Sequence, residues 1–89
     1  MKLTRTPRFK RQTKRILPNE KDVLRGVIKA ILRKPETGEQ LSGDLGDVWI
    51  VKFKIRNREC RLAYIFSEEE LCLLAFGPRE NFYRDLKRS

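Results

Sequence analysis

The hydrophobic and polar residues between Val48 and Phe76 alternate in the way that is typical of β-strands. In residues 49–55, every second side chain is apolar, from Trp49 to Ile55. The positions between them include Lys52 and Lys54. Polar turn sequences interrupt the pattern near residue 57 and at residues 67–70. The stretch therefore predicts a three-stranded antiparallel meander. Its last strand, residues 71–76, is apolar on both faces, as expected of a strand inside a sheet.

The first turn of the meander determines which residues face each other. A two-residue turn at Asn57-Arg58 keeps the alternation in step and places Lys54 opposite Arg61. Two cations in that position repel. A bound phosphate would offset the repulsion, although long side chains can also separate in water. The small Ala63 would lie opposite Lys52, which leaves space for a ligand. The same register pairs Phe53 with Leu62, Ile55 with Cys60 and Arg56 with Glu59.

The N-terminal segment predicts a strand followed by a helix. Met1–Arg5 fits an edge strand, and Thr6-Pro7 is typical of a helix N-cap and first helical position. A helix over residues 7–17 follows. The first seventeen residues contain seven Lys or Arg and no acid, so the outer face of this helix is basic.

A second helix over Glu20–Lys34 has the strongest periodicity in the chain. Pro18 ends the helix before it, and Asn19 can cap the new one, with Asp22 in the capping-box position. The short connection predicts an antiparallel helical hairpin. The apolar side chains that follow the helical spacing are Leu24, Val27, Ile28, Ile31 and Leu32.

Two further segments lack a strong pattern. Pro35 begins a loop in which Leu41 and Leu45 are expected to pack on the core. At the other end of the chain, residues 79–88 predict a short terminal helix or tail, which Phe82 and Leu86 can anchor through their four-residue spacing.

Composition limits the function further. A chain of 89 residues has room for one domain, residues 1–89, and its net charge of +9 attracts polyanions. No apolar run approaches the length of a membrane span, and the basic N-terminus lacks the apolar segment of a secretory signal. We therefore expect a soluble, cytoplasmic protein. The two cysteines are expected to be buried and reduced, and the absence of histidine excludes His-based triads and the usual zinc sites.

The cations offer two candidate sites. Arg79 and Tyr83 are one helical turn apart and could join the basic residues of the meander in holding a phosphate, or could lie on a solvated helix. A run of charge on a helix is usually a solvated face, but the size of the net charge favours binding to RNA. The candidate RNA-binding residues are Lys10, Arg11, Lys14, Arg15 and Arg56.

The order of these motifs resembles the RelE/ParE superfamily of bacterial and archaeal toxins. The resemblance rests on Pro35 to Leu45, Lys52-x-Lys54, Arg61-Leu62-x-Tyr64 and Gly77-x-Arg79-Glu80, and it covers nearly the whole chain. It implies an α+β, RelE-like fold: an N-terminal helical hairpin packed on a mainly antiparallel four-stranded sheet, with a short C-terminal helix.

In the RelE branch, the resemblance implies a ribosome-dependent endoribonuclease that cuts mRNA in the decoding site by attack of a ribose 2′-hydroxyl on the adjacent phosphate. Lys52 and Lys54 match that branch's paired basic residues, Arg61 its phosphate-stabilising arginine and Arg79 its second arginine. Tyr83 is the candidate for its tyrosine, although it stands closer to the arginine than in the best-known members. Relatives with a Gly-x-His-Glu-Asn-Phe-Tyr ending carry histidine at the position of Arg79.

Three hypotheses follow. The first is a toxin that acts as an mRNA interferase, with a cognate antitoxin, the ribosome and mRNA as partners and with no cofactor, metal or membrane. The second is a ParE-like inhibitor of DNA gyrase without nuclease activity. The third is a non-enzymatic RNA-binding module. Retention of the full basic set favours the first.

Overall fold

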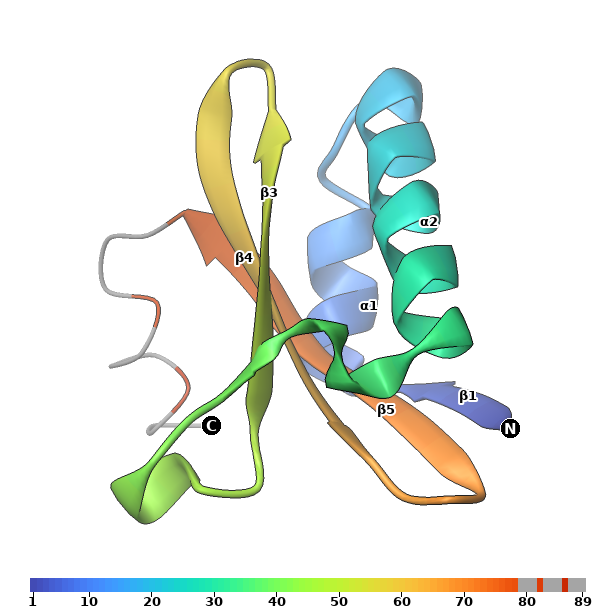
Figure 1. The fold of residues 1–89 in the computed structure, drawn as a ribbon. Coiled ribbons are helices and arrows are strands. Elements are labelled where there is room, and N and C mark those ends of the chain that lie inside the picture. Colours follow the sequence, from blue (N-terminus) through green and yellow to red (C-terminus); the bar gives the residue numbers. More distant parts are fainter. Residues whose placement is uncertain (79–81, 83–85, 87–89) are drawn as a thin grey trace.

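The computed structural model describes residues 1–78, Phe82 and Leu86. Within them, two helices lie on one side of a sheet in which the strands follow the order β1-β5-β4-β3-β2 (Figure 1). The helices are α1 (Pro7–Thr13) and α2 (Pro18–Arg33). The strands are β1 (Lys2–Arg5), β2 (Glu39–Gln40), β3 (Trp49–Ile55), β4 (Arg58–Phe66) and β5 (Glu70–Pro78), and short 3-10 turns, η1 and η2, cover Pro35–Thr37 and Gly43–Leu45.

The α+β class and the mainly antiparallel sheet are confirmed, but the predicted number of strands is wrong. The sheet has five strands, because Glu39 and Gln40 form a two-residue strand within the predicted loop and pair with Ile50 and Trp49. Two residues are too few to produce a periodic pattern in the sequence. The predicted edge strand at the N-terminus is confirmed, and it runs parallel to β5.

Helix α1 begins as predicted and ends earlier. The side-chain oxygen of Thr6 accepts a hydrogen bond from the amide of Phe9 at 3.1 Å, and Pro7 occupies the first turn. The helix ends at Thr13 rather than Leu17, because Leu17 precedes Pro18 and is held in an extended conformation. The helical hairpin is thus uneven, with a two-turn first helix.

Helix α2 begins two residues before its predicted start. Leu17 is the N-cap and Pro18 the first helical residue, and the Glu20 carboxylate accepts a hydrogen bond from the Leu17 amide at 2.8 Å. The prediction that Asn19 caps this helix, with Asp22 in support, is therefore wrong. Proline at the first position explains the difference, because its missing N–H would be unpaired there in any case.

The first turn of the meander lies at Arg56-Asn57, one residue before the predicted position. Both residues have positive φ, 52° and 65°, as a tight two-residue hairpin turn requires. This turn pairs Lys52 with Arg61 and Lys54 with Glu59. The predicted pairing of Lys54 with Arg61 is wrong, and so are the other pairings of that register.

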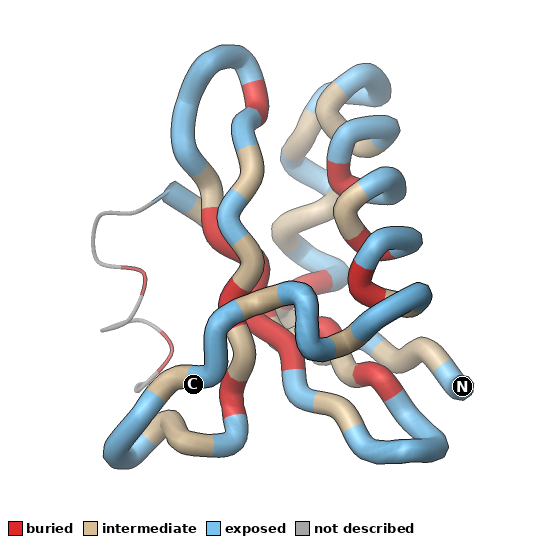
Figure 2. Tube along the Cα trace, in the orientation of Figure 1, coloured by how far each residue is buried: buried red, intermediate tan, exposed pale blue. Residues whose placement is uncertain are grey.

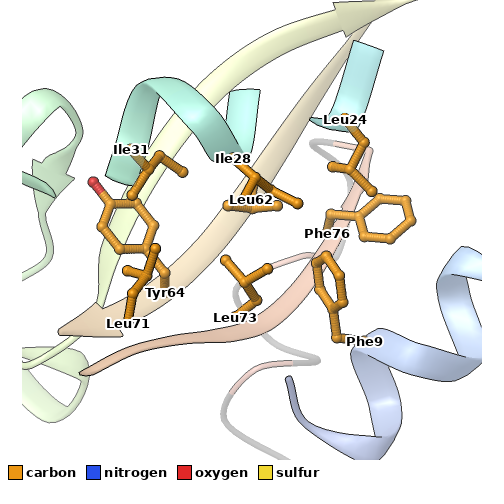
Figure 3. Close-up of a cluster of buried hydrophobic side chains, with 9 residues drawn as sticks. All are labelled: Phe9, Leu24, Ile28, Ile31, Leu62, Tyr64, Leu71, Leu73 and Phe76. Carbon is orange, nitrogen blue, oxygen red and sulfur yellow. The ribbon is translucent and has the colours of Figure 1, made fainter. Parts of the chain in front are cut away.

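The helix-covered face of the sheet carries the larger core. Figure 2 shows that buried residues concentrate where α2 faces the strands, and Figure 3 shows how these side chains meet. The rings of Phe9 and Phe76 pack edge to face, with their centroids 5.3 Å apart. The buried members of this cluster are Phe9, Leu24, Ile28, Ile31, Leu62, Tyr64, Leu71, Leu73 and Phe76.

Tyr64 connects this core to the loop after α2. Its hydroxyl donates to the Pro35 carbonyl at 2.6 Å and accepts from the Gly38 amide at 3.2 Å. A Cβ on Gly38 would lie 2.5 Å from the carbonyl oxygen of Ile50 and 2.6 Å from the tyrosine oxygen. Glycine is required here because the loop passes so close to the sheet.

The opposite face of the sheet carries a second, smaller core. Leu41 and Leu45 pack on it, as predicted. Phe82 and Leu86 are also buried there, which confirms them as anchors; the rest of the predicted terminal helix lies outside the described residues. The buried members of this second cluster are Val48, Ile50, Ala63, Ala75, Phe82 and Leu86.

Helix α1 is attached to β5 by two side chains. The Gln12 amide donates to the Phe76 carbonyl at 2.7 Å and accepts from the Phe76 amide at 2.9 Å, as a neighbouring strand would. The Thr6 hydroxyl donates to the Leu74 carbonyl at 2.6 Å. Leu74 lies at a break in the register between β4 and β5, so Thr6 satisfies a carbonyl at an irregular position.

Candidate functional site

Three of the predicted site residues share the sheet face that the helices leave uncovered. Trp49, Val51 and Phe53 pack against the helix-side core, so the alternating residues Lys52 and Lys54 point the other way. On β4 the same alternation places Arg61 on that opposite face, because Leu62 belongs to the helix-side core and Ala63 to the other cluster. We call Lys52, Lys54 and Arg61 the cationic face.

The register brings two of these cations directly together. Lys52 is the cross-strand partner of Arg61, and Lys54 lies two residue pairs further toward the turn. Like charges in this position destabilise a sheet. Ala63 lies opposite Ile50 rather than Lys52, and it is fully buried among the residues that include Phe82 and Leu86. The space for a ligand predicted at Ala63 is therefore filled by the protein.

The three cations differ in exposure. Lys52 and Lys54 are exposed, whereas Arg61 is only 5% exposed. The Nη2 atom of Arg61 lies 3.1 Å from Oε1 of Glu59, whose side chain is 43% exposed. A guanidinium this deeply buried needs a negative partner, and Glu59 supplies one.

Sequence analysis missed Glu59 as a member of this site. It faces Lys54 across the hairpin rather than Arg56, and it forms the ion pair with Arg61. The signal was present in the sequence, because Glu59 and Arg61 are two residues apart on one strand and must share a face. A carboxylate among three cations offsets their repulsion and competes with any incoming anion for Arg61.

The fifth strand continues the site beyond Arg61. Gly77 is the partner of Arg61 on β5, and a Cβ on Gly77 would lie 3.7 Å from a ring carbon of Phe82. That distance is an ordinary van der Waals contact, so Phe82 lies beside the strand segment that pairs with Arg61. Arg79 and Tyr83, the other two predicted catalytic residues, lie outside the described residues.

The predicted RNA-binding residues do not form one surface. Lys10, Arg11, Lys14 and Arg15 are all exposed, but Lys10 and Lys14 line a groove toward α2, whereas Arg11 lines a hollow on the other side of α1. Arg56 lies in the turn between β3 and β4, where its Nε is 3.5 Å from Oε2 of Glu20. That ion pair directs Arg56 toward the start of α2 and away from the cationic face.

Two titratable groups have shifted pKa values. Burial raises the pKa of the Tyr64 hydroxyl above its ordinary value of 10.0, against the opposing effect of the Gly38 amide. Burial also raises the pKa of the Cys60 thiol above 9.0, and the nearby Glu20 adds to the shift. Both cysteines are free, and they are half-buried rather than fully buried as expected.

Among the described residues, no group of three or more His, Cys, Asp or Glu side chains could hold a metal ion. In the same part of the chain, neither helix is long and apolar enough to cross a membrane. The lysine and arginine side chains of the cationic face offer positive charge and hydrogen-bond donors. Such groups stabilise a phosphate and the negative charge that develops on it.

Solved structures of toxins share this fold. A double arginine-to-alanine mutant of Escherichia coli RelE in the free state has a TM-score of 0.75 and 19% identity, over 98% of this chain and 94% of that chain. The toxin in the intact E. coli RelBE toxin–antitoxin complex has a TM-score of 0.70 and 18% identity, over 89% and 96%. A copper-bound mutant toxin from Helicobacter pylori has a TM-score of 0.69 and 26% identity, over 92% and 98%.

The chain thus has the α+β fold that these toxin structures share. The sequence profile of the family described as ParE-like toxin of type II bacterial toxin-antitoxin system matches residues 3–87. The chain therefore belongs to that family, within the RelE/ParE superfamily. No individual curated protein matches it in sequence.

Proposed function

We propose that this toxin is a ribosome-dependent mRNA interferase of the RelE type. The observation that carries the proposal is the cationic face: Lys52 and Arg61 lie directly opposite each other, and Lys54 is exposed beside them. An arrangement that concentrates repelling charges on one open face is best explained by an anionic substrate.

The reaction needs no histidine. The 2′-hydroxyl oxygen of a ribose attacks the adjacent phosphorus, and the bond from phosphorus to the 5′-oxygen of the next nucleotide breaks. The products are a 2′,3′-cyclic phosphate and a free 5′-hydroxyl. In the proposed assignment, Lys52 or Lys54 helps to remove the proton of the attacking hydroxyl, and a proton passes to the departing 5′-oxygen.

Arg61 is proposed to bind the non-bridging phosphate oxygens, where a guanidinium can donate two parallel hydrogen bonds. Its burial fixes the direction of the side chain, which favours positioning over flexibility. Arg79 is proposed to stabilise the charge that develops in the transition state, and Tyr83 is the candidate for the tyrosine of the RelE branch. The ribosome would position the mRNA.

The proposed partners are a cognate antitoxin, the ribosome and mRNA, and the proposed location is the cytoplasm. The RelBE structure, whose toxin shares this fold, is a complex of toxin and antitoxin. The net charge of +9 would favour association with an acidic antitoxin segment or with ribosomal RNA.

A second candidate function is inhibition of DNA gyrase without nuclease activity. The family that matches the chain is described as ParE-like, which favours this alternative. Gyrase inhibition would not require Lys52, Lys54 and Arg61 to act on a phosphate. The two functions therefore make opposite predictions for variants of the cationic face.

The decisive experiment adds purified toxin to a cell-free translation extract and maps mRNA ends by primer extension. We expect cuts at codon-defined positions that carry a 5′-hydroxyl, and we expect them to disappear with Arg61→Ala or Arg79→Ala. The double variant Lys52→Ala with Lys54→Ala tests the exposed residues, because their removal leaves the core intact. Arg58→Ala is the matched control for Arg61→Ala, because it removes an exposed arginine from the same strand, β4. Intact mRNA with accumulating gyrase cleavage complexes would establish the alternative.

A further inference from the structure

A groove of about 400 Å³ lies between α1 and α2, on the side of the sheet away from the cationic face. Its floor is apolar and consists of Phe9, Leu24 and Ile28. Its rim is positively charged, and the rim residues come from β1, α1, α2 and the connection between the two helices. We call it the basic groove. Its five cationic residues are Arg5, Lys10, Lys14, Lys21 and Arg25.

The cations of the two helices form two rows. Lys10 and Lys14 are four residues apart at the C-terminal end of α1, and Lys21 and Arg25 are four residues apart in the first half of α2. A four-residue step corresponds to about 6 Å along a helix. Arg25 shares an ion pair of 3.2 Å with Asp22, but both side chains are more than 70% exposed, so the pair offsets little of the charge.

The burial of the floor indicates the kind of partner. Phe9, Leu24 and Ile28 are 1%, 3% and 9% exposed, so they leave almost no apolar surface for a protein to cover. Protein interfaces are also depleted in lysine, which forms three of the five rim residues. A phosphate backbone needs only cations at suitable spacing, and it releases counterions when it binds them.

We propose that the basic groove binds the sugar-phosphate backbone of folded RNA. This surface is separate from the proposed cleavage site, since the sheet lies between them. The inference rests on the proposed function only in naming RNA as the polyanion. A toxin with phosphate-binding surfaces on both faces could dock on structured ribosomal RNA while the cationic face holds a single strand.

The groove changes which residues of the first helix are assigned to RNA binding. Lys10 and Lys14 line it, whereas Arg11 and Arg15 do not. It also adds Lys21 and Arg25, which the pattern of α2 did not single out. The proposal thus separates residues of equal charge that are neighbours in sequence.

The test measures binding of a fluorescein-labelled RNA hairpin to the full-length protein at several salt concentrations, without ribosomes. The main variant is Lys21→Gln with Arg25→Gln. Its matched control is Lys29→Gln with Arg33→Gln, which removes the same residue types at the same spacing from exposed positions of α2 outside the groove. A second comparison sets Lys10→Gln with Lys14→Gln against Arg11→Gln with Arg15→Gln. Thermal unfolding verifies that each variant is folded.

We expect each groove variant to bind the hairpin about tenfold more weakly than its control, with a salt slope smaller by one to two, roughly one for each phosphate that the variant no longer neutralises. Equal weakening in variant and control would overturn the proposal, because only net charge would then matter. Poly-glutamate serves as a second probe, in place of the hairpin. Groove variants that lose binding to poly-glutamate but still bind the hairpin would also overturn the proposal and would indicate an acidic protein partner. Because no cleavage is measured, these outcomes are independent of whether the toxin cuts mRNA.

Discussion

The two faces of the sheet use the same three strands for different purposes. On the helix side, large side chains such as Leu62, Leu73 and Phe76 meet α2 and form the main core. On the other face, β3 and β4 carry Lys52, Lys54 and Arg61, and the buried strand residues of β4 and β5 there are alanines. A strand with one face in a core can thus tolerate repelling charges on the other, because burial on the first face stabilises it.

Within the second face, the distribution of side-chain size matters as much as charge. Ala63, Ala75 and Gly77 together create a shallow surface on β4 and β5, and Phe82 and Leu86 fill it. The cations lie toward the hairpin, beyond this filled region. The comparison predicts that stability depends on one face and anion binding on the other.

The largest expected effect comes from truncation on the helix side. Leu73→Ala removes a fully buried side chain and should destabilise the protein by about 2–5 kcal/mol, measured by urea unfolding. The control is Leu74→Ala, its half-buried neighbour, which packs against the smaller core. We expect the control to cost less than half as much. Equal costs would show that the two faces contribute alike.

The next effect concerns the loop that Tyr64 holds. Gly38→Ala should destabilise the protein by about 1–3 kcal/mol, because the new Cβ would meet the Ile50 backbone at 2.5 Å. Gly26→Ala is the control: it lies within α2 and nothing approaches its Cβ position within 4 Å, so it should stabilise by about 0.5–1 kcal/mol. Both are measured by thermal unfolding, and a destabilising Gly26→Ala would contradict the packing described.

A smaller effect should separate binding from stability on the cationic face. Glu59→Gln removes the carboxylate that competes for Arg61, in an ion pair whose guanidinium is buried and whose carboxylate is part-exposed. We expect a non-cleavable 2′-deoxy oligonucleotide to bind about fivefold more tightly. The control, Glu69→Gln, makes the same change in net charge at an exposed residue of the β4–β5 turn. Tighter binding in both variants to the same degree would exclude a direct role for Glu59.

If Glu59 instead accepts the proton of the attacking hydroxyl, the same variant gives a different result. Binding of the oligonucleotide would then change little, and mRNA cleavage in the translation extract would disappear. Cleavage that persists in Glu59→Gln, together with tighter binding, supports its action as a competing anion.

The smallest effect is a dependence of stability on alkaline pH. Burial raises the pKa of Tyr64 above 10.0, so the stability linked to its neutral form is complete below pH 10 and declines as pH rises through the folded-state pKa. Tyr64→Phe should remove this decline. The measurement is the difference in unfolding free energy between the two proteins from pH 8 to 11.5. A constant difference across that range would contradict the assignment.

The sequence contained enough information to place the cations on one face but not to pair them. The predicted turn at Asn57-Arg58 was wrong by one residue. Each residue of β3 therefore pairs with a residue of β4 two positions earlier than predicted. A shift of two preserves the face of every residue. For this reason Lys52, Lys54 and Arg61 do share a face, although Arg61 lies opposite the other lysine.

Other features could not be predicted because they depend on distant partners. The roles of Gln12 and Gly38 follow from contacts with Phe76 and Ile50, which are far away in sequence. Asn19 and Asp22 have the residue types of a cap, but the helix begins at Pro18 and Leu17 is its N-cap. Local preference is a weak guide wherever two acceptable starts compete.

The short second strand has a consequence for association between copies of the chain. β2 pairs with Trp49 and Ile50, and within residues 1–78 no strand pairs with the outer side of β3 beyond them. An open strand edge invites edge-to-edge pairing and aggregation, and lysine is one of the residues that prevent it. Lys52 and Lys54 lie on this open part of β3. The residues proposed to act on RNA would therefore also keep the toxin from polymerising through its own sheet.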